Sequence, residues 1–168
     1  MKIRWLILLC FVLIAGCSHS PSTIEEAMNE SDIPYDDILK TFDPDNKHTV
    51  VFYRNDHQYN VGLLKHKRQS WTWIVGTNSD IKLEQDIDWS YCNLNELSPM
   101  FVGTVNNKDI RTVIVETRKV KTEAQLISTS DGTVYWYVLL DEPQYPPMRF
   151  TGYDDRGQIV YDTGPLDD

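Results

Sequence analysis

The most reactive side chains in this sequence are a cysteine, Cys92, and a pair of closely spaced acids, Asp86 and Asp88. A thiol becomes a nucleophile when a nearby base lowers its pKa. Trp89, Tyr91 and Leu94 flank Cys92 and no base lies close to it in the sequence, so we expect Cys92 to be a small buried apolar residue. The two acids would share one face of an extended segment and could act as paired carboxylates. Their polar surroundings favour a solvated acidic loop instead.

The candidate metal ligands are the histidines and the acids of one turn. The histidine spacing does not place two ligands on one face of a helix or strand. The histidines are His19, His48, His57 and His66. Asp43, Asp45 and Asn46 begin like an EF-hand loop, but its sixth and twelfth positions are His48 and Arg54. The sequence therefore predicts a turn here, strand ends at His48 and His57, and neither a metal site nor a cofactor.

Two features could bind a partner, and each also has a purely structural explanation. The strands expected over 59–64 and 71–76 flank the basic run Lys65–Arg68, so they are predicted to form a hairpin with a charged tip. This tip could contact an anionic surface such as a wall polymer or lipid headgroups, although hairpin turns are commonly charged. Several aromatic residues could form an exposed ladder for sugars or peptides, but we expect most of them in the core. They are Trp71, Trp73, Tyr135, Trp136 and Tyr137. Strand alternation predicts that Tyr135 and Tyr137 face away from Trp136.

Known catalytic motifs do not occur. The glycines form neither a dinucleotide-binding nor a phosphate-loop pattern, no serine lies in GxSxG, and HExxH and paired CxxC are absent. Because these motifs are absent, we assign no catalytic residue from the sequence.

The first segment predicts export. Lys2 and Arg4 precede an apolar run from Trp5 to Ala15, which is shorter than the ~18–20 residues of a membrane-spanning helix. This length suits the central region of a secretory signal. We expect residues 1–16 to be a signal peptide that is cleaved from the mature chain.

The end of the apolar run, Leu13–Cys17, resembles the lipobox of bacterial lipoproteins. This resemblance implies that the Cys17 thiol receives a diacylglyceryl group and that cleavage follows Gly16. Residues 17–22 would then be a lipidated tether, since two acyl chains hold a protein stably on a membrane. The alternatives are an ordinary signal peptide with a cysteine there by chance and an uncleaved anchor helix. After cleavage Cys92 would be the one free thiol, so the mature domain would contain no disulfide.

Composition narrows the class of protein. The chain has 168 residues, of which 41% are hydrophobic, and this excludes disordered, collagen-like and polytopic membrane proteins. The formal charge of −9 becomes −11 when Lys2 and Arg4 leave with the signal peptide. Such a charge disfavours nucleic acid as a partner.

The remaining residues, 23–168, are predicted to form a single β-rich globular domain. A helix capped by Ser22, with Glu25 three residues later, should run to about Asn29, and a helical turn is expected over 36–41. The stretch from Gly76 to Pro99 is predicted to be a polar loop. Strands are expected over 49–53, 59–64, 71–76, 100–105, 110–116, 123–127, 134–140, 149–153 and 158–161. About nine strands and one short N-terminal helix predict a mainly β fold, an antiparallel β-sandwich or a small barrel.

Several strand and turn segments are similar to small uncharacterised lipoproteins of bacilli and related Gram-positive bacteria. The similar segments are Val50–Tyr53, Val61–Leu64, Trp71–Trp73, Phe101–Val105 and Tyr153–Tyr161. The resemblance implies a lipid-anchored domain on the extracytoplasmic face of the cell membrane, and it assigns a residue-level role to Cys17 alone.

Two functions follow as hypotheses. The first is a noncatalytic binding or interaction domain at the cell envelope, with an envelope protein or a wall ligand as partner. The alternative is an envelope enzyme, hydrolase-like, whose site combines distant residues such as Asp86 or Cys92 with a histidine. Its groups would have to lie within hydrogen-bond reach of one another.

Overall fold

The computed structural model describes residues 20–56, 58–79, 84–94, 97–129 and 132–166. These residues form one helix and twelve strands arranged in three antiparallel sheets, which confirms the mainly β fold. Residues 1–16, predicted to be a signal peptide, and Cys17, His19 and His57 lie outside the described residues. No helix in the described part of the chain combines the length and apolar character needed to cross a membrane.

The helix α2 (Ile24–Glu30) begins one residue later than the predicted cap would place it. Thr23 is the N-cap, because its hydroxyl accepts a bond from the backbone N–H of Glu26 at 3.1 Å. The Glu26 carboxylate accepts bonds from the backbone N–H and the hydroxyl of Ser22, at 2.6 and 2.9 Å. Ser22 therefore holds the helix start from outside, and the capping pair is Thr23 with Glu26.

Four consecutive strands form the first sheet, in the order β1-β2-β3-β4. They are β1 (Asp37–Phe42), β2 (His48–Asn55), β3 (Gln58–Lys67) and β4 (Ser70–Ser79). The predicted hairpin with a charged tip is confirmed as β3 and β4. Its turn contains only Arg68 and Gln69, since the strands continue to Lys67 and Ser70.

The helical turn expected over residues 36–41 is wrong. This segment is β1, which pairs with β2 so that Ile38 lies opposite Tyr53 and Phe42 lies opposite Val50. A single helical turn forms few hydrogen bonds of its own. Pairing along β2 satisfies the backbone and brings Phe42 against the core.

The other eight strands form two further sheets. The middle sheet has the order β5-β6-β10-β9, and the third sheet has the order β12-β11-β7-β8. The middle sheet contains β5 (Ile87–Cys92), β6 (Met100–Val105), β9 (Gln125–Ser128) and β10 (Val134–Leu139). The third sheet contains β7 (Thr112–Thr117), β8 (Lys121–Glu123), β11 (Met148–Tyr153) and β12 (Ile159–Asp162).

The polar loop predicted from Gly76 to Pro99 is wrong over part of its length. Residues Ile87–Cys92 form β5, an edge strand paired along its whole length with β6. Ile87 and Cys92 are buried, whereas Trp89 and Tyr91 are a little over one-third exposed. The polar composition reflects an edge strand with a half-exposed face rather than a loop.

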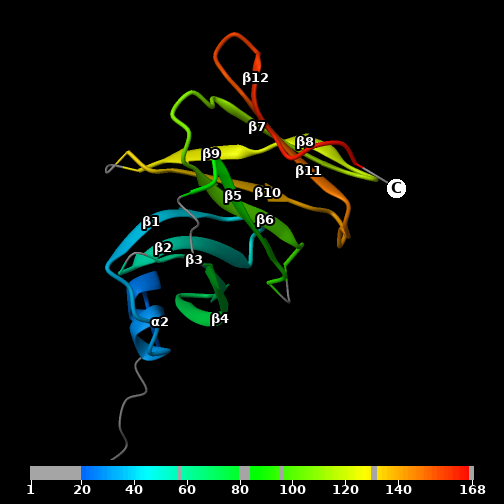
Figure 1. The fold of residues 1–168 in the computed structure, drawn as a ribbon. Helices are drawn as coiled ribbons and strands as arrows, with labels where there is room; N and C mark the ends of the chain where they lie inside the picture. The colour runs from blue at the N-terminus through cyan, green and yellow to red at the C-terminus, as the bar shows by residue number, and fades with distance from the viewer. Residues whose placement is uncertain (1–19, 57, 80–83, 95–96, 130–131, 167–168) are drawn as a thin grey trace, which may run out of the picture.

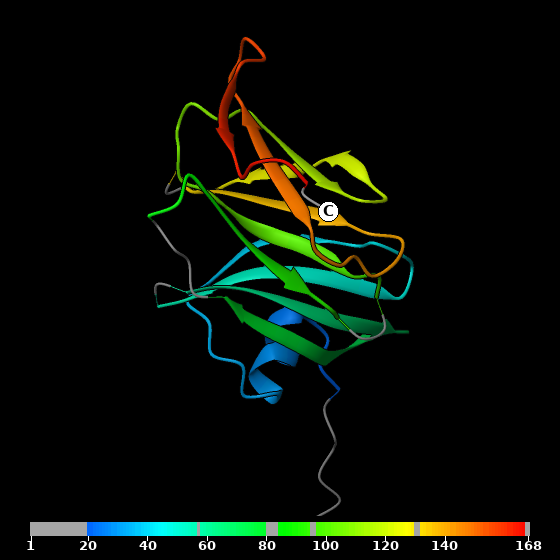
Figure 2. The ribbon, with the colours of Figure 1, turned by 45° about the vertical axis from the view of Figure 1, so that its right-hand side comes forward.

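The three sheets stack as layers, and α2 covers the outer face of the first sheet (Figures 1 and 2). Of the two predicted architectures, the sandwich is therefore the one observed. Tyr135 packs in the core between the first and middle sheets, and Trp136 packs in the core between the middle and third sheets. Their opposite orientation confirms the predicted alternation. Burial of both rings also confirms that these two aromatic residues belong to the core.

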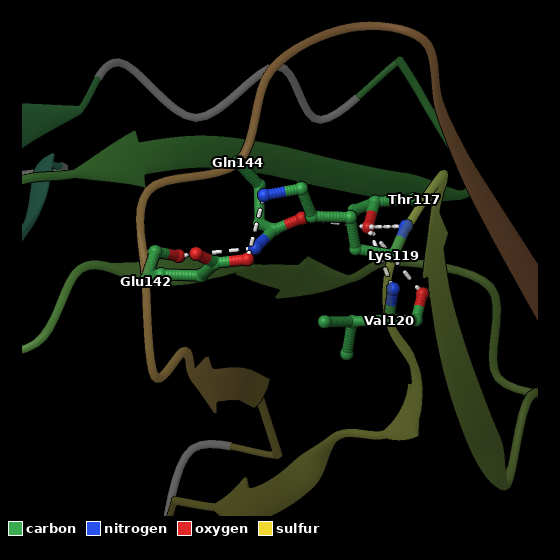
Figure 3. Close-up of polar contacts among 5 residues, drawn as sticks. All are labelled: Thr117, Lys119, Val120, Glu142 and Gln144. Carbon is green, nitrogen blue, oxygen red and sulfur yellow. Dashed lines mark hydrogen bonds and ion pairs between the residues drawn. The ribbon is translucent and has the colours of Figure 1, made fainter.

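A polar network fixes one end of the third sheet to the loop that follows β10 (Figure 3). The buried Thr117 hydroxyl donates to Oε1 of the buried Gln144 at 2.8 Å and accepts the backbone N–H of Val120 at 3.0 Å. Nε2 of Gln144 donates to the backbone carbonyl of Glu142 at 3.1 Å. The β7–β8 turn and the β10–β11 loop are thus joined through satisfied buried polar groups.

Candidate functional site

Three polar side chains form a row across the middle sheet. Asp88 of β5 lies directly opposite Thr104 of β6, which lies directly opposite Tyr135 of β10. Side chains of directly opposed residues project from the same face of a sheet. Because Tyr135 packs in the core beneath the first sheet, the whole row faces the first sheet. All three residues are buried, with 7% of Asp88, 2% of Thr104 and 3% of Tyr135 exposed.

Two hydroxyls of this row are unpaired. Among the described residues, neither Thr104 Oγ1 nor the Tyr135 hydroxyl finds a hydrogen-bond partner. Both residues line a cavity of about 20 Å³, here called the inner cavity, together with Asp88. Leaving a buried hydroxyl unpaired costs about 1–3 kcal/mol. Two such groups on one small cavity therefore mark a place where a polar partner would be bound favourably.

A much larger pocket adjoins the inner cavity. This outer pocket has a volume of about 590 Å³, and Tyr59 and Thr104 line both spaces. The outer pocket is formed where the end of β6, the loop 106–111 and the start of β10 meet the first residues of β3. A volume of several hundred cubic ångströms is typical of small-molecule sites.

The loop that borders the outer pocket is held in place by its asparagines. Nδ2 of Asn106 donates to the Gln85 carbonyl at 2.7 Å, and its backbone N–H donates to the Asp86 carbonyl at 2.9 Å. Oδ1 of Asn107 accepts the backbone N–H of Asp109 at 2.9 Å. These bonds therefore give the loop a fixed shape as one wall of the pocket.

Positive charge lies at the outer pocket. Lys108 and Arg111 both line the pocket and are exposed. Nη1 of Arg111 donates to the backbone carbonyls of Lys108 and Ile110, at 2.6 and 3.2 Å. These bonds orient the guanidinium without neutralising it, so its charge remains available to an anion.

The predicted acidic pair occupies two different environments. Asp86 is exposed, and its backbone carbonyl holds the loop after β6. Asp88 is buried in β5 and lines the inner cavity, so the interpretation of a solvated acidic loop is wrong for this residue. The signal that sequence reasoning missed is the pairing of β5 with β6, which depends on residues about fifteen positions away.

Cys92 lies in the core between the first and middle sheets, as predicted for a small buried residue. Its Sγ lies 3.5 Å from the hydroxyl of Thr77, and burial raises the pKa of the thiol. The Thr77 hydroxyl also donates to the Val61 carbonyl. His48 pairs with Lys65, four residues from Val61 along β3, or about 13 Å at ~3.3 Å per residue. A thiol–histidine pair between Cys92 and His48 is therefore not formed.

The EF-hand-like segment is a turn, as expected. Asp45 Oδ1 accepts the backbone N–H groups of Lys47 and His48 at 2.7 and 2.9 Å, and its Oδ2 contacts His48 Nδ1 at 2.8 Å. The hydrogen bond to His48 is the main reason that the pKa of Asp45 is lowered. Within the described residues, no three His, Cys, Asp or Glu side chains are grouped as metal ligands. His48 begins β2, which confirms its predicted place at a strand end.

Of the other binding candidates, Tyr137 of the middle sheet packs against Phe42, with 4.6 Å between the ring centroids, and the rest lie on the first sheet. Trp71 and Trp73 are partly buried against the core that α2 covers. The His66 ring lies 4.4 Å from the Trp71 ring, measured between centroids. Lys67 and Arg68 are exposed at the β3–β4 turn. The first sheet therefore uses its tryptophans mainly for packing, while the charged turn stays in solvent.

Sequence reasoning missed most of the pocket. Thr104 lies in the apolar strand Met100–Val105, and the sequence pattern marks Tyr135 as an aromatic ring rather than as a hydroxyl. A threonine between apolar residues of a doubly buried strand is a signal that could have been noticed. Comparison with family models, curated proteins and solved structures finds no match to this chain.

Proposed function

We propose that this chain is a lipid-anchored extracytoplasmic protein whose β domain is a noncatalytic binding module of the cell envelope, with the outer pocket as its ligand site. The observation that supports the pocket is the pair of unpaired buried hydroxyls, Thr104 and Tyr135, on a cavity that adjoins a larger cationic pocket. The support for the anchor is the lipobox-like run that ends at Cys17.

The lining favours a small hydroxylated anion. Lys108 and Arg111 supply positive charge at the outer pocket, and the inner cavity has room for about one hydroxyl group or water. Tyr59 lines both spaces, with its ring 4.6 Å from the Tyr135 ring between centroids, and we propose that a sugar packs against the part of this ring that borders the outer pocket. Acidic sugars of envelope polymers combine these features, so we propose a carboxylated saccharide as the ligand class.

The ligand class is tested with two probes that differ by one acidic group. N-acetylmuramic acid and N-acetylglucosamine share the sugar ring, and only the first has a carboxylate. Binding of each to the mature chain is measured by calorimetry. We expect the acid to bind more tightly, and Arg111→Gln to weaken it roughly tenfold or more, because hydrogen bonds to charged groups contribute about 1.5–3 kcal/mol. Arg118→Gln, an exposed cation of the β7–β8 turn, is the control.

Binding of neither probe would reject the saccharide assignment. Equal binding of both probes by the parent chain and by Arg111→Gln would reject the role of the cations. Thr104→Val tests the inner cavity separately, because it removes the hydroxyl and preserves the shape of the side chain.

The anchor is tested by labelling cells with a fatty acid and fractionating them. The parent chain should carry the label and sediment with membranes, and Cys17→Ser should carry none and lose its stable attachment. Equal membrane attachment of both proteins, without label in either, would contradict the anchor.

A further inference from the structure

The basic β3–β4 turn lies beside the point at which the described chain begins. The backbone N–H of Trp71 donates to the Pro21 carbonyl at 2.9 Å, which ties the start of the chain to the start of β4. Ser20 and Ser22 line one open depression together with Lys67 and Arg68. The two cations and the N-terminal segment thus share one surface, although they are about 45 residues apart in sequence.

Cys17 lies only three residues before Ser20. Three extended residues reach at most about 10 Å. If Cys17 carries the lipid, this surface is held close to the headgroups, at a height comparable with the ~8 Å over which charges interact in physiological salt. The inference that follows therefore rests on the anchor proposed above.

The charge at this surface opposes that of the whole chain. The formal charge is −9, yet the turn adds Lys67 and Arg68 to the neighbouring Lys65 of β3. Two acids close to this surface make bonds within the fold: Glu26 accepts bonds from Ser22, and Asp45 accepts bonds from His48. An anionic membrane would repel the acidic body and attract the turn, so the two effects favour the same orientation.

We propose that the β3–β4 turn, with Lys65, Lys67 and Arg68, is the membrane-facing surface of the anchored domain and contacts anionic phospholipid headgroups. This orientation has a consequence for the binding site. Tyr59, which lines the outer pocket, lies eight residues before Lys67 on β3, or about 26 Å away along the strand. The outer pocket therefore opens at the end of the domain remote from the bilayer.

The test uses the mature chain as it is purified from cells, mixed with vesicles of phosphatidylcholine alone or of phosphatidylcholine with phosphatidylglycerol. Acetylation of each lysine is followed by mass spectrometry, with Lys121 of β8 in the third sheet as the internal reference. Lys65 and Lys67 should react more slowly in the anionic vesicles. Each cation near such a surface contributes about 1 kcal/mol, so we expect the acetylation rates of Lys65 and Lys67 to fall roughly fivefold to thirtyfold in anionic vesicles. High salt should abolish this difference.

A matched pair of variants identifies the turn as the cause. Lys67→Gln with Arg68→Gln should abolish the protection of Lys65. Arg118→Gln with Lys119→Gln removes two consecutive cations from another hairpin turn, at the layer farthest from the first sheet, and should leave the protection of Lys65 and Lys67 unchanged.

Flotation of the same vesicles separates this inference from the anchor. Flotation with neutral vesicles, combined with equal reactivity of Lys67 in both compositions, would overturn the orientation and leave the anchor standing. Failure to float with neutral vesicles would reject the anchor. In that case, flotation with anionic vesicles would still support the contact of the turn, provided that Lys67→Gln with Arg68→Gln abolishes it. Failure to float with both neutral and anionic vesicles would overturn the anchor and the orientation.

Discussion

Toward the third sheet, the middle sheet presents Trp136 and Phe101, which are fully buried in an apolar core. The indole N–H of Trp136 donates to the Asp88 carbonyl at 3.1 Å, so this ring is satisfied as well as buried. Toward the first sheet, the same strands present Thr104 and Tyr135, whose hydroxyls are unpaired among the described residues.

The contrast between the two faces of the middle sheet indicates that one face serves stability and the other serves binding. A core with satisfied polar groups contributes its full burial free energy, whereas unpaired hydroxyls reduce the stability of the core that contains them. A protein can retain such a loss when a ligand compensates for it. The interface with the third sheet is therefore expected to hold the layers together, and the polar end of the other interface is expected to bind.

The largest effect should come from the satisfied core. Trp136→Ala removes a fully buried ring that lies 5.7 Å from Phe150 between ring centroids. It should lower the free energy of unfolding by about 3–5 kcal/mol in urea titrations. Tyr145→Ala, at a side chain that is 75% exposed, is the control and should change it by less than ~0.5 kcal/mol. A loss below ~1 kcal/mol for Trp136→Ala would show that this core does not dominate stability.

A satisfied buried hydroxyl supplies the next effect. Thr117→Val removes the donor to Gln144 and the acceptor of the Val120 N–H, and leaves buried polar groups without their partner (Figure 3). We expect a loss of about 1–3 kcal/mol in the free energy of unfolding. Adding Gln144→Leu should recover part of this loss, because the stranded amide is then gone. No recovery in the double variant would mean that the turn bonds, rather than the Gln144 contact, carry the effect.

Strand alternation was enough to predict much of the sandwich, including the hairpin of β3 and β4 and the opposite orientation of Tyr135 and Trp136. It did not reveal β1 or β5, because their polar residues match those of turns and loops until an edge of a sheet is available for pairing. The order of the strands depends on contacts between distant residues, and no local pattern encodes it. The outer pocket was unpredictable for the same reason, since Tyr59, Thr104 and Arg111 meet only after the sheets stack.

A smaller effect is expected at acid pH on the outer surface of the third sheet. The Arg149 guanidinium donates to Asp162 at 2.9 Å through Nε and lowers the pKa of that carboxyl to about 2. A carboxyl with a lowered pKa stabilises the fold above its unfolded pKa, near 3.8. This stabilisation should decline as the pH falls from about 4 and should be gone below about 2.

Carbon-detected NMR of the Asp162 carboxyl measures this titration directly. Arg149→Gln should move the pKa of Asp162 upward and flatten the dependence of stability on pH over the same range. An Asp162 pKa near 3.8 in the parent chain would show that the ion pair is not formed in solution.

The smallest change in the free energy of unfolding is expected for Thr104→Val, and the sign of this change is informative. Thr104 and Thr117 are both buried and differ in whether the hydroxyl has partners. Removing an unpaired hydroxyl relieves its desolvation cost, so Thr104→Val should leave the free energy of unfolding unchanged or raise it by up to ~1 kcal/mol. Tyr135→Phe should behave in the same way.

If Thr104→Val instead costs as much as Thr117→Val, its hydroxyl is paired in the folded chain, and the two interfaces of the middle sheet do not differ in polar satisfaction. A stabilised variant that also binds the acidic sugar less tightly would link the unpaired hydroxyl to ligand recognition rather than to folding.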